Sequence, residues 1–308
     1  FQFFRQWIAL REYAHSRAIR IIGDIPLYVA LDSADAWSNT GIFEFDENLD
    51  PVRVGGVPPD YFSETGQLWG NPLFRWDVLK ETGYRWWIDR IRTNLFLYDI
   101  IRIDHFRGFA AYWAVPYGEK TAIRGDWVPC PGMEFFEAMQ HEFGDLPIIA
   151  EDLGVITPDV EELRDGFGLP GMKILQFAFD SEEANDYIPH NYIKNCIVYT
   201  GTHDNDTVLG WYQSASEKDR KHLLDYIDGK KEEIHWSLIR LAWASVANTA
   251  IVPMQDLLGL GTEARMNLPG TTTTNWQWRA SASAFSPALA ERLAGLTQLF
   301  GRCRLKSC

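Results

Sequence analysis

Short apolar runs rich in β-branched residues recur along the chain and alternate with amphipathic stretches of helical spacing. The runs are strand-sized and carry few polar positions, which is typical of parallel strands covered by helices. We expect six strands, at residues 19–25, 100–103, 146–150, 172–179, 196–199 and 249–254. This alternation of strand and helix predicts an α/β fold with right-handed crossovers.

Two of the predicted helices have recognisable ends. Thr157 and Pro158 supply a cap and a first-turn proline for the helix that follows them. Ser286 and Pro287 begin a later helix, and Gly301 ends it. The opening stretch also has helical spacing with interior charges, so no export signal is expected.

Acidic residues stand at or just beyond the C-terminal ends of four predicted strands. They are Asp24, Asp104, Glu151 and Asp204. In a (β/α)8 barrel that end forms the active-site rim. An open doubly wound sheet also binds ligands at strand C-termini, but the chain contains neither GxGxxG nor GxxxxGK[ST]. A TIM-type barrel is therefore the predicted fold.

Composition and charge exclude several classes of protein. The 308 residues are 46% apolar and 14% aromatic, which excludes a disordered chain. A formal charge of -13 disfavours a nucleic-acid partner. No apolar run is long enough to cross a membrane. Four cysteines without CxxC or zinc spacing are expected to be reduced, and we expect a cytoplasmic protein.

Asp104 and Glu151 have different surroundings. Arg102 precedes Asp104 by two residues, so along a strand both side chains point to the same side, and the guanidinium favours an ionised Asp104. Glu151 follows an apolar run, so burial and neighbouring charge are expected to raise its pKa. Breaking a glycosidic bond with retention requires one ionised carboxylate and one protonated carboxyl about 5–5.5 Å apart. We therefore expect Asp104 to be the nucleophile and Glu151 the general acid/base.

A third carboxylate, Asp204, stands beside His203 and would hold sugar hydroxyls in the transition-state geometry. His105 is expected to do likewise. The plainer alternative is that each acid is a helix cap or an ion-pair partner. A metal site is a further alternative, but no HxH or HExxH pair occurs and Arg102 would repel a cation, so we expect none.

The connection between the first two predicted strands is long and contains many glycines, prolines and aromatic residues around positions 51–75. Loops of this length in compact domains are usually functional. We expect an ordered lid, with Trp69 over the site. An insertion that only completes the packing is the alternative.

Whole phrases of the chain resemble the 4-α-glucanotransferases of glycoside hydrolase family 77, also called amylomaltases or disproportionating enzymes. They span about residues 19–269 and are GDIPLYVALDSADAW, GVPPDYFSETGQLWGNP, RIDHFRGF, AEDLGVITPDV, LPGMKILQFAF and YTGTHDNDT. The resemblance implies a (β/α)8 barrel, no cofactor, and transfer of α-1,4-glucan segments between chains. The substrates would be maltooligosaccharides and glucans derived from starch or glycogen, with glucose as an acceptor. It also implies the cytoplasm, or a plastid in a plant or alga.

The resemblance also assigns roles to individual residues. Asp104 would be the nucleophile, Glu151 the general acid/base and Asp204 the transition-state stabiliser. Four residues would line the donor subsite: Arg102, His105, His203 and Asp24. On the lid, Tyr61 and Trp69 would lie against the glucan, with Asp60 near the site.

The chain also departs from the family pattern. Family members carry a long stretch before the first strand identified here, including two barrel strands, so we expect residues 1–300 to be a catalytic barrel lacking its first two strands. Residues 301–308 resemble nothing in the family and would be a frame-shifted or vector-derived tail. Two alternatives stay open: a hydrolase of the same clan, and an inactive remnant that binds glucan.

Overall fold

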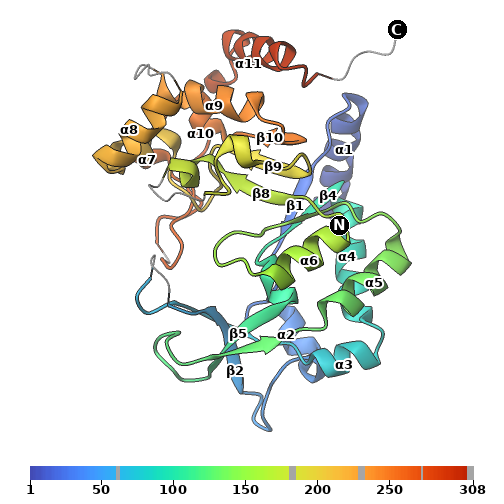
Figure 1. Ribbon diagram of the computed structural model, residues 1–308. Coiled ribbons are helices and arrows are strands. Elements are labelled where there is room, and N and C mark those ends of the chain that lie inside the picture. The colour runs from blue at the N-terminus through green and yellow to red at the C-terminus, as the bar shows by residue number, and fades with distance from the viewer. Residues whose placement is uncertain (60–62, 180–184, 228–232, 272, 304–308) are drawn as a thin grey trace. The chain divides into compact units, whose positions relative to one another are not determined.

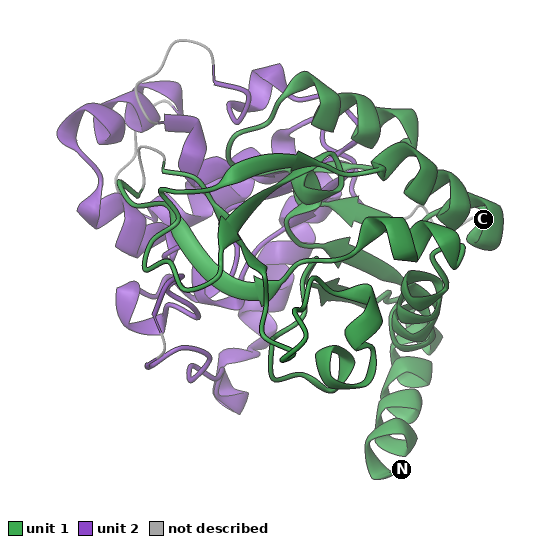
Figure 2. Ribbon diagram, turned by 90° about the horizontal axis from the view of Figure 1, so that it is seen from below, with its two compact units in different colours: residues 1–171 green, residues 172–308 purple. Residues whose placement is uncertain are grey.

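The computed structural model describes the chain except residues 60–62, 180–184, 228–232, 272 and 304–308. The chain divides into two compact units, Phe1–Gly171 and Met172–Cys308 (Figure 2). Each unit has its own apolar core and is described separately below.

A three-stranded parallel sheet lies at the centre of unit 1. Its order is β1 (Ile22–Ile25), β4 (Ile100–Ile103), β7 (Ile148–Ala150), and β1 and β4 lie side by side in Figure 1. Asp24 pairs in register with Arg102, and Arg102 with Ile149. The side chains of Ile101, Ile103 and Ala150 are fully buried, which explains the uninterrupted apolar runs.

A second sheet in unit 1 is antiparallel and was not predicted. Its order is β3 (Gln67–Pro72), β2 (Arg53–Val57), β5 (Ala111–Pro116), β6 (Asp126–Pro129). The segment expected to form a lid therefore contributes two strands, β2 and β3.

Six α-helices occur in the described part of unit 1. They are α1 (Gln2–Ser16), α2 (Ala34–Ser38), α3 (Trp76–Glu81), α4 (Arg85–Leu97), α5 (Gly132–Phe143) and α6 (Pro158–Gly166). Two 3₁₀ helices, η1 (Thr40–Ile42) and η2 (Phe106–Phe109), lie in the connections. Thr157 lies at the N-cap of α6 as predicted, but its side chain makes no capping hydrogen bond.

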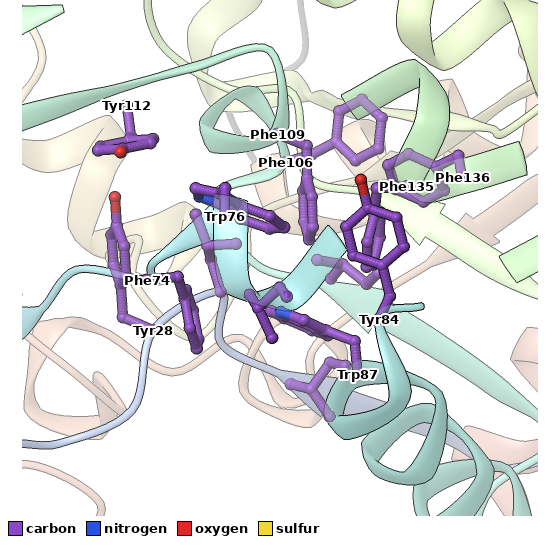
Figure 3. Packing of buried hydrophobic residues seen from close by; sticks show 14 of the residues in the cluster. Tyr28, Phe74, Trp76, Tyr84, Trp87, Phe106, Phe109, Tyr112, Phe135 and Phe136 are labelled. Carbon is purple, nitrogen blue, oxygen red and sulfur yellow. The ribbon is translucent and has the colours of Figure 1, made fainter. Parts of the chain in front are cut away.

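The core of unit 1 is aromatic. The Phe109 ring is fully buried, with its centroid 4.8 Å from that of Phe135, 5.2 Å from that of Phe136 and 5.5 Å from that of Trp87 (Figure 3). Most of these pairs are edge-on or tilted, the arrangement that aromatic quadrupoles favour. Much of the aromatic content is thus used for packing.

A separate three-stranded sheet belongs to unit 2. The sheet order is β10 (Thr249–Ile251), β9 (Cys196–Tyr199), β8 (Gly171–Ile174), where β8 begins at the last residue of unit 1. Strands β9 and β10 pair in parallel. Its α-helices are α7 (Val208–Ser214), α8 (Glu217–Tyr226), α9 (Ile234–Ala244), α10 (Met254–Leu258) and α11 (Pro287–Leu299). Its 3₁₀ helices are η3 (Leu175–Phe179), η4 (Pro189–Asn191), η5 (Thr262–Ala264) and η6 (Ala282–Ala284).

Two of the predicted strands in unit 2 are shorter than expected. The strand predicted over 172–179 ends at Ile174, where the chain turns into the 3₁₀ helix η3. Within η3, Gln176 is buried and its side-chain amide donates to the Asp206 carbonyl. The strand predicted to reach residue 254 ends at Ile251, since Pro253 has no N–H for a ladder and precedes α10. The helix that begins at Ser286 is confirmed, and the Ser286 hydroxyl accepts from the Leu289 N–H.

Both units mix helices and strands, so the α/β class is confirmed, whereas closure into a (β/α)8 barrel stays a prediction. Within the described residues, no helix has both the length and the apolar character needed to cross a membrane.

Candidate active site

Arg102 joins two carboxylates at the C-terminal ends of β1 and β4. Its Nη1 lies 2.8 Å and 2.7 Å from the two carboxylate oxygens of Asp24, and its Nη2 lies 3.0 Å from Asp104 Oδ1. The guanidinium side chain is only 9% exposed, whereas both carboxylates are 42% exposed. The expected pairing of Arg102 with Asp104 is therefore present, and the two acids remain open to solvent.

The charge on Arg102 is firmly held. Burial opposes it, but the carboxylates of Asp24, Asp104 and Glu151 outweigh burial and raise the pKa of Arg102 above its ordinary range. A guanidinium fixed in this way stabilises the ionised form of the carboxylates that it contacts. The ion pair with Arg102 thus favours the ionised form of Asp104.

Glu151 follows β7 directly, and backbone groups hold both of its carboxyl oxygens. The His105 N–H donates to Oε2 at 2.7 Å, and the Leu153 N–H donates to Oε1 at 3.0 Å. His105 has a φ of 54°, in the left-handed region that non-glycine residues rarely adopt. The residue whose N–H binds Glu151 thus has a left-handed backbone conformation.

The surroundings of Glu151 favour its protonated form. Burial, followed by the charge of Asp104, raises the pKa of Glu151 to about 8, although Arg102 and the two backbone N–H groups oppose the shift. This agrees with the expectation from the apolar run before Glu151. At neutral pH these surroundings favour a protonated Glu151 near Asp104, which is paired with Arg102. Acid-assisted displacement at an acetal carbon requires two carboxyl groups that differ in this way.

The His105 ring is neutral and buried. Burial, with a smaller effect of Arg107, lowers the pKa of His105 to about 3. Within the described part of the chain, His105 Nε2 has no hydrogen-bond partner. The ring packs edge-on against Trp69, with centroids 4.7 Å apart, and also lies near Tyr28. A neutral imidazole suits hydrogen bonding to a hydroxyl group rather than pairing with an anion.

Trp69 lies on β3 rather than at the tip of a loop. Its side chain is 37% exposed, and its indole N–H donates to Gln67 Oε1 at 3.2 Å. It extends the group formed by Asp24, Arg102, Asp104, His105 and Glu151, all in unit 1. Asp60 and Tyr61 lie outside the described residues, so their predicted places on the lid stay predictions.

His203 and Asp204 form a second group, in the turn after β9 of unit 2. Asp204 Oδ1 accepts from the Asn267 amide at 2.6 Å, and Oδ2 lies 3.3 Å from His203 Nε2. Arg265 donates to the Asp204 carbonyl at 2.7 Å. The Trp276 ring lies 5.1 Å from that of His203 and is 62% exposed.

Buried polar contacts fix the turn that carries Asp204. Asp256 is only 1% exposed, accepts from the Thr200 hydroxyl at 2.6 Å and accepts from the Val208 N–H at 2.8 Å. These bonds tie the end of β9 and the start of α7 to α10. The turn that carries Asp204 is therefore held at both of its ends by the buried Asp256.

Sequence reasoning missed several residues of the two groups. The strand pattern points to acids at strand ends, whereas Asn267, Arg265 and Trp276 come from the segment after α10. The phrase EARMN, which joins a cation and an amide after the last predicted strand, was the available signal. The backbone donors to Glu151 left no signal, because any residue type supplies an N–H.

Among the described residues, no group of three or more His, Cys, Asp or Glu side chains is arranged to hold a metal ion. Among the described cysteines, Cys130 and Cys303 are free thiols.

Comparison with known proteins agrees with this chemistry. A family model described as 4-alpha-glucanotransferase, of glycoside hydrolase family 77, matches residues 1–284. A 4-alpha-glucanotransferase of Synechocystis is 56% identical over 303 residues, covering 97% of this chain and 60% of the relative. One from Clostridium butyricum is 52% identical over 306 residues, covering 98% and 63%. The chain thus spans about three fifths of the length of these relatives.

Solved structures give the same result. An amylomaltase from Streptococcus agalactiae in complex with acarbose superposes with a TM-score of 0.94 at 42% identity, covering 97% of this chain and 61% of that one. An amylomaltase from Corynebacterium glutamicum, 19% identical, matches in fold with a TM-score of 0.75 and covers 97% of this chain and 48% of that one. Since the family model covers most of the chain, the protein belongs to the 4-alpha-glucanotransferase family, glycoside hydrolase family 77.

Proposed function

We propose that these residues form the catalytic part of a retaining 4-α-glucanotransferase that moves α-1,4-glucan segments between maltooligosaccharides. The observation that carries the proposal is the pairing of Asp104 with Arg102 beside Glu151, whose pKa is about 8. This arrangement supplies an anion and an acid at one place, the two groups needed for double displacement at an anomeric carbon.

In the first half-reaction an Asp104 oxygen attacks the anomeric carbon of the donor. The bond from that carbon to the glycosidic oxygen breaks, and Glu151 gives its proton to this oxygen, so the shortened glucan leaves with a free 4-hydroxyl. The products are a glycosyl ester on Asp104 and an ionised Glu151. Arg102 holds Asp104 in position for the attack.

In the second half-reaction a 4-hydroxyl of an acceptor sugar loses its proton to Glu151 and attacks the same anomeric carbon. The ester bond breaks and the Asp104 carboxylate returns to its ion pair. Two inversions retain the α configuration. Water in place of the sugar would give hydrolysis, so a lid over the site favours transfer. We assign this function to the segment with Asp60, Tyr61 and Trp69.

The remaining residues complete the proposal. Asp204, held by Asn267, would bind sugar hydroxyls in the transition state, with His203 beside it. Asp24 and the neutral His105 would contact the donor. The acarbose bound to the Streptococcus agalactiae relative supports an α-glucan ligand. We also propose the (β/α)8 barrel for the protein that carries these residues.

Incubation with maltotriose tests the function. We expect glucose and longer oligomers at a constant number of reducing ends, and the new glycosidic linkages should be α in the NMR spectrum. A steady rise in reducing ends would show the alternative hydrolase. Retained starch binding without any product would contradict the proposal and identify an inactive remnant.

The Asp104→Asn variant tests the nucleophile in the same assay. The change is nearly isosteric, so the circular dichroism spectrum and melting temperature should stay close to those of the parent, while the transfer rate falls about 10⁴-fold or more. A rate within about tenfold of the parent would refute the assignment. Asp89→Asn, on an exposed face of α4, is the matched control and should leave the rate unchanged.

A further inference from the structure

The loop between β7 and α6 carries Glu151, and a buried ion pair holds it immediately after that residue. Arg164 of α6 donates from Nη1 to Asp152 Oδ2 at 2.6 Å. Their side chains are 10% and 3% exposed, so the pair lies almost entirely out of water. Removing one partner of a buried ion pair leaves the other charge unpaired and out of water, which costs free energy. Without the Arg164 cation, the Asp152 carboxylate would therefore shift from its position.

The start of β8 leaves room for this carboxylate. A Cβ on Gly171 would lie 2.2 Å from Asp152 Oδ2, far inside contact distance. The backbone of Gly171 is not in the left-handed region, so glycine is needed here for space rather than for conformation. Two elements, α6 and β8, therefore fix the place of Asp152.

A second arginine holds the far side of the same loop. Arg107, in η2, donates to the Val155 carbonyl at 2.5 Å, and its guanidinium lies 3.9 Å from the centre of the Trp127 ring. The loop is thus held at Asp152 and again at Val155. Leu153, whose N–H donates to Glu151 Oε1, lies between these points.

We infer that Arg164 is a positioning residue for the general acid: by holding Asp152 it keeps the Leu153 N–H on the Glu151 carboxyl. The inference rests on the proposed function for its meaning in catalysis. Neither Arg164 nor Asp152 is assigned to contact the sugar, and both act through the loop.

The pKa of Glu151 depends on the charged and polar groups that face it, including one from its own loop. From β4 and the turn after it come the Asp104 charge, which raises the pKa of Glu151, and Arg102 and the His105 N–H, which lower it. From its own loop comes the Leu153 N–H, which also lowers it. Loss of this donor should raise the pKa of Glu151 further.

The test uses the active protein that carries these 308 residues and compares two variants with a matched control for each. Arg164→Gln removes the cation, and Gly171→Ala displaces Asp152 without touching Arg164. Asp165→Asn is the control for the first, because Asp165 is a 57% exposed partner of the same guanidinium, away from Glu151. Gly166→Ala is the control for the second, since a Cβ there meets only Met133 at 3.9 Å.

The first measurement is the titration of Glu151 in ¹³C-glutamate-labelled protein without substrate, assigned by its absence from Glu151→Gln. We expect Arg164→Gln and Gly171→Ala to move the midpoint upward by about one pH unit, and both controls to leave it unchanged. Arg164→Lys keeps the cation, so its midpoint should lie close to that of the parent. It replaces Arg164→Gln in the comparison if that variant does not fold.

The second measurement separates proton donation from other steps. The sugar that leaves from maltotriose must receive a proton, whereas the fluoride that leaves from α-maltotriosyl fluoride needs little help from a general acid. We expect Arg164→Gln to slow transfer from maltotriose about tenfold and from the fluoride less than about threefold.

An unmoved midpoint in folded Arg164→Gln and Gly171→Ala, or equal slowing with both donors, would overturn the inference and leave Arg164 with a purely structural role. A parent protein without transfer would contradict the proposed function alone, because the substrate-free titration still decides whether Arg164 positions Glu151.

Discussion

The proton on Glu151 links activity to stability. In the folded chain the pKa of Glu151 is about 8 against an ordinary value of 4.5, so between these pH values the folded state binds a proton that the unfolded state has lost. The free energy of unfolding therefore falls as pH rises from about 4.5 to about 8, and the full penalty is present above that range. The same titration should produce the alkaline limb of activity near pH 8.

Replacing Glu151 by Gln removes the penalty, so we expect the variant to be inactive with maltotriose yet more stable than the parent. Near pH 5 the two melting temperatures should be close. At pH 8 the free energy of unfolding of the variant should exceed that of the parent by about 1 kcal/mol or more. Glu161→Gln, at an exposed position on α6, is the control. Melting curves that differ by the same amount at both pH values would contradict the shifted titration.

At this scale the sequence was informative where a local rule acts. Strand alternation placed Arg102 and Asp104 on one side, and their ion pair is present. The bonds from His105 and Leu153 to Glu151 depend on how two loops meet, which no local pattern records. Thr157 shows the opposite failure: a favourable capping residue stands at the right place, yet its hydroxyl makes no capping bond.

Among the elements, the first helix depends on polar anchors. α1 buries no residue, and it is tied to unit 1 through Asp99, which accepts from the Ile21 N–H at 2.8 Å, from Arg11 at 3.0 Å and from His15. Partial burial opposes ionisation of Asp99, but these donors outweigh it and lower its pKa to about 2. The stabilisation is therefore present above pH 4 and lost as pH falls toward about 2.

The Asp99→Asn variant keeps the shape and removes the charge. We expect amide hydrogens of α1 to exchange about tenfold faster, with little change in the buried strands, because helix opening is local. Peptide-resolved exchange at neutral pH measures this, with exposed Asp89→Asn as the control. Unchanged protection of α1 would show that other contacts, such as the Trp7 N–H to the Leu97 carbonyl, suffice.

The two sheets differ in how far sequence reveals them. Buried parallel strands have continuous apolar runs, and the predicted positions of β4 and β9 match in full. The strand β2 contains two glycines, which disfavour strands when judged alone. Here a Cβ on Gly55 would lie 2.8 Å from the Tyr28 ring, and one on Gly56 would lie 2.5 Å from the Gln67 carbonyl oxygen. Close packing therefore requires residues that propensity counts against a strand.

The described residues form one large apolar core in each unit, and a smaller cluster around Val54 and Val115 lies in unit 1. Phe109 is fully buried in the first and Leu238 in the second. A core truncation costs the lost transfer free energy and leaves a cavity, about 3–5 kcal/mol for Phe→Ala and about 2–5 kcal/mol for Leu→Ala. Because neither cluster includes buried residues of the other unit, each truncation should weaken its own unit first.

We therefore expect Phe109→Ala to accelerate amide exchange mainly within residues 1–171, and Leu238→Ala mainly within residues 172–308. Exchange followed by mass spectrometry resolves peptides from both units, and Trp37→Ala, at an 83% exposed side chain, is the control. Equal acceleration of both units by either variant would show that the chain opens as one cooperative body. Faster exchange confined to unit 1 in Phe109→Ala and to unit 2 in Leu238→Ala would show that each core is stabilised largely by its own contacts. A site in one unit would then keep its structure when the core of the other unit is truncated.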